Sequence, residues 1–185
     1  MKRRFTLLAV AVALAASACG SGPSLTEYAS ELEGLVTAHN AGMDANDRDF
    51  GNAPQTVERI RAYAATRMEL RREFLEALEV LETPGEAEDL HGAAVETIRT
   101  LVAAEQELFN VATTSDDMDE LGNLWSSPAG QTARAADAQA IAICQAAEAA
   151  INSTEERQAL VGMPWVPTEL QEVVTVAFGC TAAER

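Results

Sequence analysis

The sequence predicts an all-α fold, a bundle of four long helices with short helices before and after the fourth. Apolar residues recur at steps of three and four positions along four long stretches, which is the period of an amphipathic helix. Aromatic residues make up only 5% of the chain and alanine is abundant, a composition that favours closely packed helices over sheets. A hydrophobic content of 48% is enough to fill one core.

The chain begins with a short positive segment and an apolar run. Lys2, Arg3 and Arg4 precede the apolar residues 5–18, which is the layout of a secretory signal. As a helix the run would be roughly 21 Å long, too short for a hydrocarbon core of about 30 Å. The segment therefore predicts export rather than a membrane span.

Small residues stand directly before the first cysteine. Ala16, Ser17 and Ala18 lead to Cys19, and this segment resembles the signal of bacterial lipoproteins, although that family usually has leucine where this chain has Ala16. The resemblance implies that signal peptidase II cleaves before Cys19 and that its thiol carries a diacylglyceryl group. The alternative is an ordinary secretory signal that is cleaved after Ala18.

The resemblance also implies where the protein works and how the chain is divided. An acylated Cys19 would hold the protein permanently at the extracytoplasmic face of the cell membrane, or at an outer membrane if the cell has one. We expect a signal peptide at residues 1–18, a lipidated cysteine and tether at 19–24, and a single helical domain at 25–185. The mature part is similar to uncharacterised helical lipoproteins of bacteria, a similarity that implies no activity.

The chain is strongly acidic. It has 13 lysines and arginines against 29 aspartates and glutamates, and without residues 2–4 the balance is 10 against 29, a net charge of −19. Such a charge repels nucleic acid and anionic lipid, so neither is an expected partner. The expected contacts are the membrane, through the anchor, and an envelope protein or wall component.

The first predicted helix spans residues 25 to about 45 and is capped by Ser24 or Thr26. Its apolar stripe contains one histidine, His39, which we expect to be a hydrogen-bonded core residue rather than a ligand. The other residues of the stripe are Tyr28, Leu32, Leu35, Val36 and Met43.

A polar loop is predicted over residues 44–54. Asp47 and Asp49 fit positions 1 and 3 of a calcium loop, and Glu58 fits position 12. Asn52 stands where such a loop needs glycine for its turn. The sequence therefore favours an ordinary connection over a calcium site.

The longest helical pattern covers residues 55–82 and carries half of the mature cations. One interpretation is a recognition patch for an anionic ligand or a partner, formed by Arg59, Arg67, Arg71, Arg72 and Trp165. The favoured alternative is that the arginines pair with nearby carboxylates, among them Glu58, Glu69, Glu73 and Glu76. Arg67 lies close to the apolar stripe, so its expected partner is a carboxylate from another helix.

The next helix is predicted to begin at the capping box of Thr83 and Glu86 and to run antiparallel to about residue 113. Near its start, Glu88 and His91 have the spacing of one half of a di-iron site, but a second such pair is missing. A mononuclear site from His39, Glu88 and His91 is left open by the sequence. No metal and no cofactor are predicted.

Two further helix starts follow. An acidic cluster after Ser115 predicts a short helix that ends near Trp125. Ser127 as a cap and Pro128 in the first turn predict an alanine-rich helix to about Asn152. Its small side chains are expected to allow close helix packing.

The C-terminal part is predicted to hold a short helix at 153–161 and a last helix at 168–179, separated by a stiff proline-bounded segment around Trp165. We expect Trp165 to plug one end of the bundle, and an exposed anchor for a partner is the alternative.

Cys144 and Cys180 are the cysteines that remain beside Cys19. An even pair in an exported protein predicts a disulfide, which would clamp the last helix onto the alanine-rich one. The loop-entropy estimate for this closure is roughly 4 kcal/mol. The alternative is a catalytic thiol, which would need His39 or His91 to reach across the bundle as its activating base.

The sequence contains no paired catalytic carboxylates at informative spacing, nucleophile motif, phosphate loop or complete metal set. It therefore predicts a non-enzymatic binding or interaction module of the cell envelope. The alternatives are a helical bundle that binds a small ligand or a metal and, last, an envelope enzyme. An exposed arginine and tryptophan patch would favour a partner, whereas buried polar groups that converge on a cavity would favour a ligand.

Overall fold

The computed structural model describes residues 22–153 and Cys180. Every regular element in this part of the chain is helical, so the predicted all-α class is confirmed. The long helices are α1 (Leu25–Gly51), α2 (Val57–Val80), α3 (Glu88–Thr114) and α5 (Pro128–Asn152). The shorter elements are α4 (Met118–Gly122) and two 3-10 turns, Gly85–Ala87 and Leu124–Ser126.

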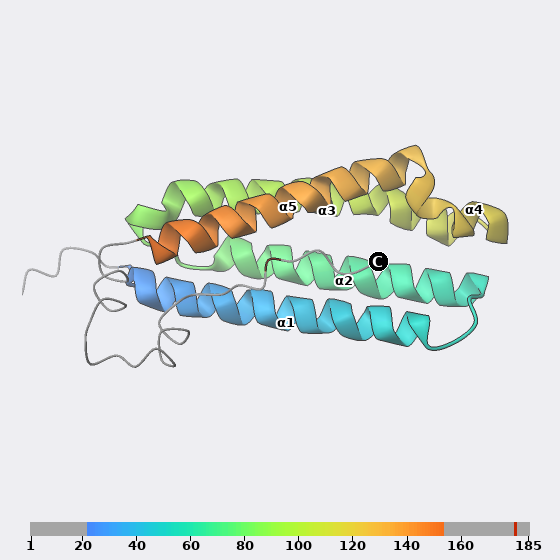
Figure 1. Cartoon of the computed structure of the whole chain (residues 1–185), viewed down its shortest axis with the longest axis horizontal. Helices are drawn as coiled ribbons and strands as arrows, with labels where there is room; N and C mark the ends of the chain where they lie inside the picture. Colours follow the sequence, from blue (N-terminus) through green and yellow to red (C-terminus); the bar gives the residue numbers. More distant parts are fainter. Residues whose placement is uncertain (1–21, 154–179, 181–185) are drawn as a thin grey trace, which may run out of the picture.

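The long helices alternate in direction and pack in chain order (Figure 1). Helix α1 packs against α2, α2 packs against α3, and α3 packs against α5 in the most extensive contact of the described residues. Helices α1 and α5 are not among the pairs that pack closely. The first and last long helices are therefore separated by an open seam.

Local sequence signals set two of the helix starts as expected. At Ser24 the side chain accepts from the backbone of Glu27, and the Glu27 carboxylate accepts from the backbone of Ser24, which is a complete capping box. At the start of α5 the Ser127 hydroxyl accepts from the Gly130 backbone at 3.1 Å, with Pro128 in the first turn.

Helix α1 continues past its predicted end. The expected loop at 44–54 is wrong, because α1 runs on to Gly51. Contacts with Tyr63 of α2 hold these polar turns. The Phe50 ring stacks on the Tyr63 ring at 4.5 Å, the Tyr63 hydroxyl donates to Asp47, and the Asn46 amide donates to the Tyr63 carbonyl.

The start of α3 also differs from its prediction. The capping box of Thr83 and Glu86 is not formed, because the Thr83 hydroxyl donates to the Leu81 carbonyl at 3.1 Å instead. A 3-10 turn at Gly85–Ala87 follows, and α3 itself begins at Glu88.

The described core consists of two apolar clusters. One gathers around Leu78 and Leu101 and includes Tyr28, Leu32 and Ala147. The other is smaller and lies where α4 and the second 3-10 turn meet α2, α3 and α5; it contains Ile60, Leu108, Ala112, Leu121, Leu124 and Ala133. Buried polar side chains occur beside these clusters.

No described helix is long and apolar enough to span a membrane. The predictions for Cys19, for Trp165 and for the helices at 154–161 and 168–179 lie outside the described residues.

Candidate functional site

A buried ion pair joins α2 to α3. The Arg67 guanidinium donates from Nε and Nη2 to Glu105 Oε1, at 3.1 and 2.6 Å, and the two residues are 5% and 3% exposed. The guanidinium also lies over the Trp125 ring, with Cζ 5.5 Å from the ring centre. The prediction that Arg67 meets a carboxylate of another helix is confirmed.

Arg71, one turn further along α2, connects the other long helices. Its Nε donates to Glu105 Oε2 at 3.4 Å and its Nη2 donates to Asp137 Oδ1 of α5 at 2.9 Å. Its Nη1 lies 3.0 Å from His39 Nε2 of α1. We call Arg67, Arg71, Glu105, Asp137 and His39 the polar layer. Each long helix contributes at least one side chain to it.

The charges of the polar layer balance. Two guanidiniums face two carboxylates, and Glu105 serves both arginines. Burial lowers the pKa of Arg71. At Arg67 burial acts in the same direction, but the attraction and hydrogen bonds of Glu105, together with the charges of Tyr63 and Asp137, leave the pKa raised. Arginine stays charged in both cases, so each buried cation depends on its carboxylate.

His39 is neutral in this arrangement. A guanidinium can only donate hydrogen bonds, so His39 Nε2 must be the acceptor and the ring proton must be on Nδ1. The ring stacks on Phe74 at 4.5 Å with an interplanar angle of 17°. Nδ1 is buried and has no hydrogen-bond partner of normal geometry among the described residues.

The surroundings oppose a second proton on His39. Burial lowers the pKa of His39 to about 4, and the positive charges of Arg71 and Arg67 act in the same direction. The Leu70 carbonyl and the Asp137 carboxylate raise the pKa only in part. The prediction of a hydrogen-bonded core histidine is confirmed.

A groove of about 380 Å³ occupies the open seam between α1 and α5 and ends at the polar layer. We call it the α1–α5 groove. Its apolar lining includes Leu32, Val36, Met43, Phe74, Leu78, Ile98, Ala140, Ile141, Ile143 and Ala147. Its polar lining is His39, Asn40, Asp44, Arg67, Arg71 and Asp137.

The two kinds of lining are separated along the groove. On α1 the described lining runs from Leu32 to Asp44, which is about 18 Å at the rise of an α-helix. The polar residues lie toward the Asp44 end, and the aliphatic residues lie mostly toward the Leu32 end. A pocket of this volume, mostly apolar with a few polar groups at one end, is typical of sites for small molecules.

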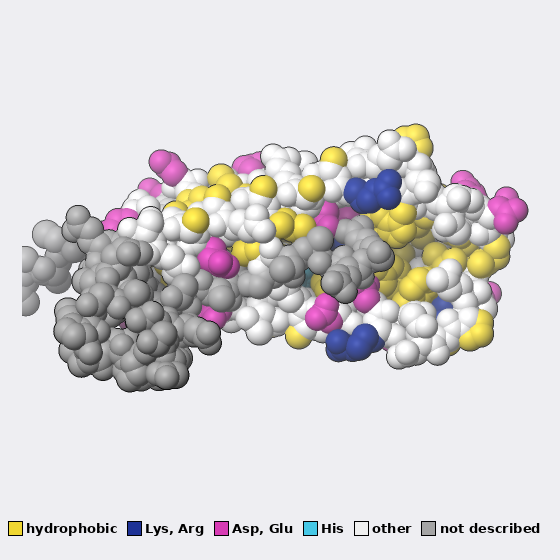
Figure 2. Space-filling view, viewed as in Figure 1, with side chains coloured by type: hydrophobic (Ala, Val, Ile, Leu, Met, Phe, Trp, Pro, Cys, Tyr) yellow, Lys and Arg dark blue, Asp and Glu magenta, His cyan; other side chains and the backbone are white. Residues whose placement is uncertain are grey.

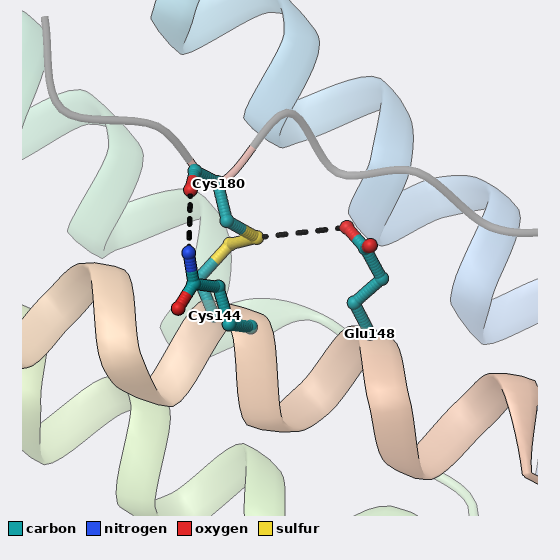
Figure 3. The surroundings of a disulfide bond; sticks show 4 residues. Cys144, Glu148 and Cys180 are labelled. Carbon is teal, nitrogen blue, oxygen red and sulfur yellow. Dashed lines mark hydrogen bonds between the residues drawn. A yellow bond between two sulfur atoms is a disulfide. The ribbon is translucent and has the colours of Figure 1, made fainter.

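A disulfide lies at the edge of the groove. The sulfurs of Cys144, on α5, and Cys180 are bonded, and the Cys180 carbonyl accepts from Gln145 Nε2 at 3.2 Å (Figure 3). Glu148 places a carboxylate oxygen 3.8 Å from the Cys180 sulfur. Both cysteines line the groove, so the bond fixes Cys180 at its wall.

The four arginines proposed as a recognition patch do not share a surface. Arg67 and Arg71 are buried, which corrects that prediction. Arg59 donates to the Asp49 carbonyl at 2.5 Å, and Arg72 donates to the Gln106 amide oxygen. The favoured alternative, that the arginines pair along α2 and across the bundle, is confirmed for the pairs across the bundle, because the acceptors of these four arginines come from α1, α3 and α5.

The candidate metal ligands do not converge. His91 Nδ1 lies 3.1 Å from the Tyr28 hydroxyl, whereas His39 is eleven residues further along α1, about 16 Å away. Asp47 is helical and accepts from Tyr63, so no calcium loop forms around it. Among the described residues no group of histidine, cysteine and carboxylate side chains could hold a metal.

Sequence reasoning missed the two carboxylates of the polar layer. Glu105 lies between Leu101 and Leu108 in the apolar stripe of α3, and Asp137 follows Ala136 in the alanine stripe of α5. A carboxylate at an apolar position of a helix is the signal that would have found both, because such a charge must be paired when buried.

We compared the chain with known proteins. No family model, no curated protein sequence and no solved structure matches it.

Proposed function

We propose that this chain is a non-enzymatic, lipid-anchored protein of the cell envelope that binds a small, mostly apolar molecule in the α1–α5 groove. The single observation that supports it is the groove itself, an apolar channel of about 380 Å³ that ends on a polar layer whose charges balance. Converging buried polar groups beside a cavity favour a ligand over a surface-bound partner.

The proposal includes the organisation of the whole chain. Residues 1–18 would act as the signal, Cys19 would carry the lipid, and 25–185 would form one bundle of four long helices closed by the Cys144–Cys180 disulfide. The lipobox-like segment before Cys19 and the bond from Cys180 to α5 support this organisation.

Mass spectrometry of the membrane fraction tests the anchor. We expect a mature chain that begins with an acylated Cys19 and in which Cys144 and Cys180 resist alkylation until they are reduced. A mature chain that starts elsewhere and is found free of the membrane would contradict the anchor.

Photo-crosslinking tests the groove. A diazirine-tailed analogue of dodecanol, added to the full chain on phosphatidylcholine vesicles, should label peptides of α1 and α5. Ile141→Trp places a large side chain in the groove and should abolish the labelling, because Ile141 lines it without belonging to the buried core. Ala142→Trp is the matched control on the exposed side of α5. Equal labelling of the two variants would contradict the site.

A further inference from the structure

Two arginines differ from all the others in the described chain. Arg59, Arg61, Arg67, Arg71, Arg72 and Arg99 each donate to a carboxylate, an amide or a backbone carbonyl. The guanidiniums of Arg48 and Arg134 take part in none of the ion pairs or side-chain hydrogen bonds found among the described residues, and both residues are exposed. In a chain where acidic residues outnumber basic ones more than twofold, unpaired arginines are unexpected.

Both arginines lie beside the polar end of the groove. Arg48 is one turn after Asp44 on the same ridge of α1, and Arg134 is one turn before Asp137 on α5. Each of these helices has only one cation, and Figure 2 shows one Lys/Arg group over α1 and another over α5 on a single face of the molecule. Arg48 and Arg134 therefore lie on the two helices that border the groove, each one turn from a residue of its polar lining.

The interior supplies no free charge to a ligand. Arg67 and Arg71 are already paired with Glu105 and Asp137, and His39 is neutral. Near the polar end, Arg48 and Arg134 are the cations whose guanidiniums have no partner among the described residues, and the carboxylates of Asp44 and Asp47 lie on the same turns of α1 as Arg48.

We infer that the α1–α5 groove takes a single-chain amphiphile with a negatively charged head group, a carboxylate or a phosphate monoester, held between Arg48 and Arg134. Its apolar chain lies along the aliphatic lining toward Leu32. The inference rests on the proposed function, since it names the class of molecule for the same groove.

The acidity of the protein does not exclude such a ligand. At physiological ionic strength charges are screened beyond about 8 Å, so the distant carboxylates act mainly on the approach of an anion. At contact, two guanidiniums can donate to the same head group, and hydrogen bonds between charged groups are the strongest kind. The sequence-based expectation that anionic lipid is repelled thus holds for an extended membrane surface and not for this groove.

The test compares head groups on one alkyl chain. Diazirine-tailed analogues of dodecanoate, dodecyl phosphate, dodecanol and dodecyltrimethylammonium are added to the full chain on phosphatidylcholine vesicles, and the labelled peptides of α1 and α5 are quantified. We expect the two anions to reach half-maximal labelling at about a tenfold lower concentration than dodecanol, and the cation to label least. The stronger of the two anions distinguishes a fatty acid from a phosphorylated lipid.

Charge variants assign the effect to the two arginines. The double variant Arg48→Gln, Arg134→Gln should lose the preference for the anions and keep the labelling by dodecanol. Arg72→Gln, Arg99→Gln removes the same charge from the contact between α2 and α3, where Arg72 donates to Gln106 and Arg99 to Glu79, and should keep the preference. Labelling by dodecanol equal to that by the anions, or an unchanged preference in the double variant, would overturn the head-group inference alone. Absence of groove labelling by all four probes would overturn the proposed function with it.

Discussion

The two faces of α5 meet their neighbours in opposite ways. Toward α3 and the second 3-10 turn, α5 presents Ala133 and Gly130, and an added Cβ at Gly130 would lie 2.5 Å from the Leu124 carbonyl oxygen. Toward α1, the described residues of α5 do not pack closely, and Asp137 is linked to His39 of α1 through Arg71. Small residues thus close one seam, whereas long charged side chains span the other and leave a groove.

Removing the carboxylate that serves both arginines should have the largest effect on stability. Glu105→Gln keeps the shape of the side chain but leaves two buried guanidiniums with a single negative partner. We expect the free energy of unfolding, measured with urea on the full chain, to fall by about 3–5 kcal/mol.

An exposed pair gives the control for this loss. Arg99 donates to Glu79 at 2.7 Å and also pairs with Glu96, and all three side chains are well exposed. Arg99→Gln should cost less than about 1 kcal/mol. Similar losses in the two variants would mean that the polar layer does not hold the open seam together.

Lowering the pH should destabilise the folded chain through His39, which lies at the open seam. The pKa of His39 is about 4 in the folded chain and 6.5 when the ring is free, so between these values the unfolded chain binds a proton that the folded chain does not. Stability therefore falls as the pH is lowered from about 6.5 to about 4, by about 3 kcal/mol from this residue, and is unaffected by it at higher pH.

Urea titrations of His39→Gln check the assignment. Glutamine can still accept from Arg71 but cannot titrate, so the variant should lose this part of the pH dependence while the other groups, including His91, contribute equally to both proteins. If the free energy of unfolding depends on pH equally in the wild type and in His39→Gln, His39 is not the acid-sensitive group.

The smallest expected difference in stability is between two substitutions that enlarge a side chain, one where α5 packs on α3 and one in the α1–α5 groove. Ala133 is completely buried, so Ala133→Leu should lower the free energy of unfolding by about 1–3 kcal/mol. Ile141→Trp extends into the groove and should change it by less than about 0.5 kcal/mol. Thermal or urea unfolding of the two variants measures the difference. Equal losses of unfolding free energy would argue that the groove is packed as tightly as the contact between α5 and α3.

The fold class was predictable because periodicity and capping are local. The start of α1 at Ser24 and the start of α5 at Ser127 follow from side chains within three residues of each cap. The end of α1 was not predictable, because its last turns are polar and are held by Tyr63 from another helix.

The site was predictable only in part, for the same reason. The position of Arg67 near the apolar stripe indicated a partner on another helix, but not which one. The choice of Glu105, and the link from His39 through Arg71 to Asp137, depends on how four helices are aligned along their axes. A groove between two helices that do not pack together leaves no signal in either helix alone.

Native mass spectrometry of the full chain, extracted gently from its own membrane, tests the central claim most directly. We predict a small molecule that stays bound without a covalent link to the wild type and to Ala142→Trp, and that is missing from Ile141→Trp. A wild type without any bound molecule, or an Ile141→Trp variant that carries the same one, would contradict a ligand in the α1–α5 groove.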